Sequence, residues 1–166
     1  RVALRFGGTL DASYTHINDQ LSQDLADNRF VTVFLGSLDA RSHRITYHSG
    51  GQGPLLHFHA ADGRCEPFGA TTVPMGLMAG LKLKPARVCE LAPGDIFALL
   101  TDGTFEYANS SGEMFEEERV GALIREHQNE PMSRLIEIIQ QSVAAFAQGA
   151  PQGDDMTMLF VRRLPG

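Results

Sequence analysis

Ile96-Phe97-Ala98-Leu99-Leu100 runs directly into Thr101-Asp102-Gly103, so that a fully apolar segment of strand length ends next to a carboxylate. An apolar run of this length is typical of a strand that is buried on both faces. A second run of this kind, residues 156–161, directly follows Asp154 and Asp155. The sequence therefore predicts two buried strands, each with acidic residues at one end.

The apolar spacing on either side of these runs predicts an α+β fold. Helical spacing covers residues 10–26, 116–128 and 132–146, and strand patterns cover residues 30–38, 44–48, 55–60, 82–91 and 95–100. We expect residues 39–43 to connect a hairpin and residues 82–91 to pair with residues 95–100 around Ala92-Pro93-Gly94. One helix, five or six mostly antiparallel strands, two helices and a last strand describe a layered sandwich.

Composition limits the class of protein. The 166 residues fit a single domain, residues 1–166, and 43% hydrophobic with 20% charged residues excludes a disordered chain. A net charge of -6 argues against nucleic acid as a partner. Cys65 and Cys89 fit two reduced thiols in the core. The sequence contains no run of about 18 apolar residues, the length that a membrane-spanning helix needs. We therefore expect a cytoplasmic protein. The start, without Met, suggests the middle of a longer protein.

Asp102, Asp154 and Asp155 are the candidate metal ligands. Adjacent carboxylates repel one another, so a cation or a cage of hydrogen bonds is needed to hold them close together. Oxygen ligands at two strand ends suit Mg²⁺ or Mn²⁺. Taken singly, Asp102-Gly103 also fits an ordinary turn and Asp154-Asp155 a solvated loop.

Motifs spread along the chain resemble those of the PP2C-like bacterial serine phosphatases of the SpoIIE/RsbU type. Thr101-Asp102-Gly103-Thr104-Phe105-Glu106-Tyr107-Ala108-Asn109 resembles the TDG-x-x-E-x-x-N signature, and Gly153-Asp154-Asp155-Met156-Thr157 resembles the closing G-D-D-x-T. Leu91-Ala92-Pro93-Gly94-Asp95, Val73-Pro74-Met75-Gly76, Tyr47-His48-Ser49-Gly50-Gly51-Gln52-Gly53-Pro54 and a helix with Asn18 and Leu21 are similar to further family motifs in the same order.

The resemblance implies a PP2C-like α-β-β-α sandwich of two mostly antiparallel sheets flanked by helices, with a two-metal centre that activates water for attack on phosphorus. It implies that Asp102 and Asp154 are catalytic metal ligands and that Asp155 is an auxiliary ligand. Gly103, which we expect at a sharp turn, would allow close backbone approach. Thr101 or Thr157 would support the carboxylates by hydrogen bonding. The cofactors would be Mg²⁺ or Mn²⁺.

Two departures from the family pattern stand out. Residues 1–10 lack the family's first metal motif, G-D-x-x-D, which supplies the aspartate that bridges the metals, and Asp11 falls on a predicted helix. We therefore expect the domain's first strands to be missing from this chain, or that half of the site to be lost. Gly50-Gly51-Gln52 also stands where the family commonly has Ala-Gly-His.

Two classes of function follow from the resemblance. One is a metal-dependent phosphatase that acts on phosphoserine or phosphothreonine of a partner protein, such as an anti-sigma-factor antagonist. An upstream sensor or receiver domain would control it within a partner-switching pathway. A homodimer is an allowed assembly. The other is a weak or inactive domain of the same fold that binds a partner as a regulatory scaffold. A non-catalytic small-ligand barrel would leave Asp102 and Asp154 unexplained.

His57 and His59 offer a competing metal hypothesis. Residues i and i+2 of a strand face the same side, a spacing that can chelate Zn²⁺ or Ni²⁺. No third ligand at a recognisable spacing accompanies them, so the simpler interpretation is a solvated strand face.

Overall fold

The computed structural model describes residues 8–26 and 29–165. They form helices and two antiparallel sheets, which confirms the predicted α+β class. The described residues divide into two compact units that interleave along the sequence. Unit 1 takes residues up to Gln52 together with Gly69–Glu90, and unit 2 takes Gly53–Phe68 together with residues from Leu91 onward.

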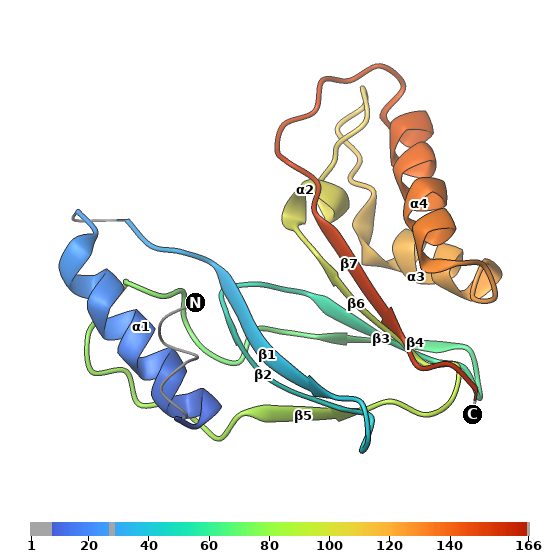
Figure 1. Ribbon diagram of the computed structural model, residues 1–166. Coiled ribbons are helices and arrows are strands. Elements are labelled where there is room, and N and C mark those ends of the chain that lie inside the picture. The colour runs from blue at the N-terminus through green and yellow to red at the C-terminus, as the bar shows by residue number, and fades with distance from the viewer. Residues whose placement is uncertain (1–7, 27–28, 166) are drawn as a thin grey trace. The chain divides into compact units, whose positions relative to one another are not determined.

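Unit 1 combines one helix with a three-stranded sheet of order β1-β2-β5 (Figure 1). Its elements are α1 (Leu10–Asp24), β1 (Val33–Asp39), β2 (Arg44–Gly50) and β5 (Arg87–Glu90). The Thr9 hydroxyl accepts a hydrogen bond from the amide of Ala12 and so caps α1. The buried Asn18 side chain donates to the Met78 carbonyl at 2.9 Å and accepts from the Gly76 amide at 3.2 Å. Asn18 thereby holds a long loop against α1.

Unit 2 contains the two apolar runs in a four-stranded sheet of order β4-β3-β6-β7. Its strands are β3 (Leu55–His59), β4 (Arg64–Phe68), β6 (Ile96–Leu100) and β7 (Met158–Arg162), and its helices are α2 (Asp102–Phe105), α3 (Glu116–Glu126) and α4 (Met132–Ala147). The β6 strand lies antiparallel to β3 on one edge and to β7 on the other. A fully apolar strand therefore lies in the interior of the sheet, where both of its edges are paired.

The core of unit 2 lies between this sheet and the two long helices, which cover one face of it (Figure 1). Strand residues alternate between faces, so every second residue of β3 and β6 points at the helices. The packed set is Leu56, Phe58, Ile96, Ala98 and Leu100 from the strands with Val120, Ile124, Leu135, Ile139 and Val143 from α3 and α4. The same alternation places His57 and Phe97 on the opposite face of the sheet.

Most predicted elements are confirmed, and one predicted strand pair is wrong. The segments 82–91 and 95–100 do not form a hairpin: β5 pairs with β2, whereas β6 pairs with β3 and β7. Turn residues between two strands show that the chain changes direction, but not that the two strands pair with each other. The apolar β6 is paired on both edges, and its partners are β3 and β7. The sequence analysis also missed β4, whose run Arg64-Cys-Glu-Pro-Phe68 lacks an apolar pattern, and the single-turn helix α2.

The predicted thiols are present: Cys89 is buried and Cys65 is half-buried. Burial raises the pKa of the Cys65 thiol to about 11. Among residues 8–26 and 29–165, no helix has the length and apolar character needed to cross a bilayer.

Asp95 is a buried carboxylate that fixes the entry to β6. One carboxylate oxygen accepts from the Ala60 amide at 2.9 Å, and the other accepts from the Ala92 amide at 2.9 Å and lies 3.1 Å from Nε2 of His57. These bonds join the end of β3 to the turn that precedes β6. The aspartate of the L-x-x-G-D pattern, Asp95, therefore has a structural role: it holds the turn before β6 against the end of β3.

We expect Asp95→Ala to lower the free energy of unfolding by about 3 kcal/mol or more, because two backbone amides and the buried His57 ring would lose their partner. The matched control is Asp62→Ala, where the carboxylate accepts from the Arg64 amide in an exposed turn. Urea denaturation of both variants measures the difference. A loss for Asp95→Ala no greater than that for Asp62→Ala would contradict this role.

Candidate functional site

Thr101 locks the end of β6 to the chain that leads into β7. Its amide donates to the Thr157 carbonyl at 3.0 Å, and its hydroxyl accepts from the Thr157 amide and donates to the Asp155 carbonyl, each at 2.9 Å. The ladder that ends at Leu100 and Met158 thus continues into the acidic loop. The sequence analysis expected Thr101 or Thr157 to bond to the carboxylates, but these bonds reach the backbone that carries them.

Gly103 brings the start of α2 against the same loop. A Cβ atom at this position would lie 2.5 Å from the Asp155 carbonyl oxygen and 3.1 Å from that of Asp154. The expected close backbone approach is therefore present. The expected sharp glycine turn is not, because Gly103 lies in α2 without a positive φ.

Asp102 and Asp154 line one pocket of about 360 Å³ in unit 2, although 52 residues separate them in sequence (154 - 102 = 52). Glu106, Tyr107 and Pro151 also line it. Oδ1 of Asp102 accepts from the Gly103 amide at 3.0 Å, and Oδ1 of Asp154 accepts from the Asp155 amide at 2.7 Å. Backbone amides thus orient each carboxylate by one oxygen, and the donor set that remains suits a hard divalent cation.

A second pocket, of about 340 Å³, shares Asp102 with the first. It is lined mainly by acidic residues: Glu106, Glu116, Glu117 and Glu118 lie around it, together with Phe105, Met114, Gly53 and Pro54. Asp102 therefore stands at a strongly negative part of unit 2, which favours the binding of cations.

Asp155 is exposed and does not line either of these pockets. Within the described part of the chain, Asp102, Asp154 and Asp155 do not form a set of three ligands whose oxygen atoms lie within 4.8 Å of one another. The structure thus brings Asp102 and Asp154 to one pocket and leaves Asp155 at its margin.

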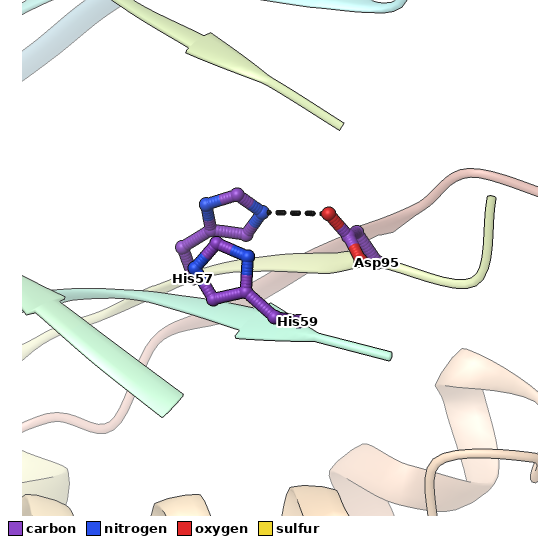
Figure 2. Close-up of side chains that lie close together, drawn as sticks. All are labelled: His57, His59 and Asp95. Carbon is purple, nitrogen blue, oxygen red and sulfur yellow. Dashed lines mark hydrogen bonds and ion pairs between the residues drawn. The ribbon is translucent and has the colours of Figure 1, made fainter. Parts of the chain in front are cut away.

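His57, His59 and Asp95 do form such a set, the only one among residues 8–26 and 29–165. Figure 2 shows the two imidazole rings beside the Asp95 carboxylate, with Nε2 of His57 turned toward it. Burial lowers the pKa of His57 from its usual 6.5, an effect that the hydrogen bond with Asp95 opposes.

Asp95 is the residue that sequence reasoning missed as a third ligand. The last pair in the β3–β6 register is Phe58 with Ile96, so the residue before Ile96 lies opposite His59. The position of Asp95 opposite His59 can be predicted only when β3 is known to be the partner of β6. The sequence analysis paired β6 with residues 82–91 instead.

Comparison with known proteins gives a consistent result. The model of the family described as Stage II sporulation protein E (SpoIIE) matches residues 1–164. The phosphoserine phosphatase RsbU of Bacillus subtilis is 24% identical over 148 residues, which cover 89% of this chain and 43% of RsbU.

Two solved structures share the fold. The RsbU and RsbW domains of a Mycobacterium tuberculosis protein give a TM-score of 0.78 at 23% identity and cover 100% of this chain and 45% of that one. The PP2C phosphatase domain with a fragment of the regulatory domain of SpoIIE from Bacillus subtilis gives 0.77 at 18% identity and covers 97% and 46%. This chain thus spans less than half the length of these relatives.

We expect Gly103→Ala to destabilise the protein by about 1–3 kcal/mol, because the new methyl group would displace the backbone of Asp154 and Asp155. Helix propensity alone would give the opposite sign, a gain of about 1 kcal/mol. The matched control is Gly153→Ala in the acidic loop, where an added Cβ meets no atom within 4 Å. Thermal unfolding of both variants is the measurement, and a stabilised Gly103→Ala would refute the close contact.

Proposed function

Because the chain belongs to the SpoIIE family, we propose that it is the phosphatase part of a metal-dependent protein that hydrolyses phosphoserine or phosphothreonine on a partner protein. The observation that carries the proposal is the meeting of Asp102 and Asp154 at one pocket where β6 ends and β7 begins. Two carboxylates from distant motifs converge there, and backbone amides orient them both.

Asp102 and Asp154 are proposed as ligands of Mg²⁺ or Mn²⁺, with Asp155 as an auxiliary ligand at the margin of the pocket. When bound, divalent cations supply an activated water and neutralise charge on the phosphoryl group. Thr101 and Gly103 are positioning residues, since they fix the backbone of the acidic loop against the start of α2. The pocket is open to solvent, which gives a phosphorylated side chain on a protein surface access to the carboxylates.

The proposed substrate is a phosphorylated anti-sigma-factor antagonist in a bacterial partner-switching pathway. This rests on the similarity to RsbU, which carries the name phosphoserine phosphatase, and on a solved relative that combines RsbU and RsbW domains. Control by a sensor or receiver domain is part of the proposal, in keeping with the greater length of the relatives. The proposed compartment is the cytoplasm.

A regulatory scaffold with weak or no catalysis is the second candidate. It is favoured by one observation, the failure of Asp102, Asp154 and Asp155 to form a single set of ligands in the described part of the chain. A scaffold would keep the fold and the acidic pocket but would hydrolyse phosphoserine or phosphothreonine slowly or not at all.

We expect Asp102→Asn to abolish phosphatase activity and to leave the free energy of unfolding nearly unchanged. The amide removes one anionic ligand, whereas the fold loses only a charge at an exposed position. Release of phosphate from a phosphoserine protein in excess Mn²⁺ measures turnover, and Asp62→Asn is the control for loss of an exposed carboxylate. Turnover of Asp102→Asn within a few-fold of the unmodified protein would overturn the assignment.

We expect the 166-residue chain alone to show little turnover even in millimolar Mn²⁺. Three carboxylates, of which Asp102 and Asp154 line one pocket and Asp155 does not, offer too few ligands for two cations, and residues 1–10 contain no Asp or Glu. The assay compares this chain with the same chain joined to any sequence that precedes it in its gene. Robust metal-dependent turnover by the 166-residue chain would show that Asp102, Asp154 and Asp155 suffice.

A further inference from the structure

We propose that His57, His59 and Asp95 form a binding site for Zn²⁺ or a similar transition-metal ion, separate from the carboxylates proposed for phosphatase chemistry. The two sets lie at opposite ends of β6: Asp95 directly precedes the strand, and Asp102 follows it after Thr101. Six residue steps from Asp95 to Thr101 (101 - 95 = 6), at about 3.4 Å each, place the two sets roughly 20 Å apart, too far for one ion or a bridged pair to serve both.

The side chains already stand near the separation that zinc ligands need. Ligands at 2.0–2.2 Å from a tetrahedral Zn²⁺ lie about 3.4 Å from one another. Nε2 of His57 lies 3.1 Å from Oδ2 of Asp95, and one ligand atom from each of the three residues falls within 4.8 Å of the others. The rings of His57 and His59 have their centroids 4.0 Å apart (Figure 2). Separations of up to 4.8 Å must shorten to about 3.4 Å to close the set, and we expect rotation about side-chain bonds to supply this change.

Asp95 is held in place independently of the histidines. Its oxygens accept from the amides of Ala60 and Ala92, both at 2.9 Å. A carboxylate has about four acceptor positions, so these two bonds leave room for a metal on the side that faces His57. Backbone donors that orient a ligating carboxylate are what a metal site requires around its ligands.

The donor chemistry selects the metal. Two imidazoles with one carboxylate suit Zn²⁺, Ni²⁺, Cu²⁺ or Co²⁺, whereas Mg²⁺ and Mn²⁺ prefer oxygen ligands. Three protein ligands leave a fourth position for water or for Glu66, whose Oε2 lies 3.3 Å from Nε2 of His59. His59 and Glu66 are partly exposed, which gives an ion access from solvent.

Binding would tie three segments of unit 2 together. His57 and His59 belong to β3, Asp95 belongs to the turn before β6, and Glu66 belongs to β4. An ion that binds only the folded protein shifts the folding equilibrium in its favour. The site therefore stabilises the sheet, and it does so whether or not the phosphatase assignment is correct.

The test uses protein stripped of metal with a chelator and titrated with Zn²⁺, and with Co²⁺ as a spectroscopic probe. We expect one equivalent of Co²⁺ to give the strong visible absorption of a tetrahedral site, and Zn²⁺ to remove it. Zn²⁺ should raise Tm by at least about 3 °C. His59→Gln should weaken binding by at least about 10-fold, since residues that merely orient a ligand already have effects of that size.

Three variants separate the site from its alternatives. His57→Gln tests the buried ligand, and His59→Gln, at a partly exposed strand end, keeps the test valid if His57→Gln does not fold. His16→Gln is the matched control on the exposed side of α1 and should bind as the unmodified chain does. Asp102→Asn should also retain the Co²⁺ spectrum. Loss of binding in Asp102→Asn, unchanged binding in His59→Gln, or displacement of Co²⁺ by equimolar Mn²⁺ would each overturn the proposal.

Discussion

The pairing of β6 on both of its edges is the constraint on which unit 2 depends. Ile96–Leu100 contains no polar side chain, so both its faces and both its edges must be covered by protein. Pairing with β3 and β7 meets this need, and the helices α3 and α4 cover one face. Because β6 is anchored in this way, the polar residues at its two ends are fixed in position.

Each end of β6 has its own polar arrangement. At the start, Asp95 accepts three hydrogen bonds in a buried setting and joins β3 to the turn before β6. At the end, Thr101 holds the backbone of the acidic loop, and exposed carboxylates line a pocket. The buried carboxylate is largely satisfied by the protein, whereas among the described residues Asp102 and Asp154 each have one side-chain oxygen engaged by a neighbouring amide. This difference favours the exposed pair for hard cations.

The sequence predicted the elements better than their pairing. Apolar runs and helical spacing identified β6, β7 and the three long helices, since burial imposes a period that the residues display. Pairing depends on contacts between distant segments, which a single sequence does not display, and so the partner of β6 was wrong. The α2 helix was not predicted, because its four residues are too few to show the helical period of apolar residues.

The candidate site was predictable only in part, for a related reason. Asp102 and Asp154 stood out because each adjoins an apolar run, and the structure brings both to one pocket. The third member of the histidine set, Asp95, adjoins an apolar run as well, but its neighbours become visible only with the register of β3 against β6. The partner of the Thr101 hydroxyl differs from the expected carboxylates, because a hydroxyl next to carboxylates can bond equally well to the backbone.

The interleaving of the two units shapes how the chain can fold. The chain passes from one unit to the other after Gln52, after Phe68 and after Glu90, so each unit is assembled from separate stretches of sequence. Neither unit can be released by trimming one terminus, and the β3–β4 hairpin reaches the ribosome exit long before its partner β6 does. Strands that must wait for distant partners close long loops, which slows folding and leaves edges unpaired in the meantime. The apolar β6 is synthesised before β7, so one of its edges stays unpaired until β7 follows.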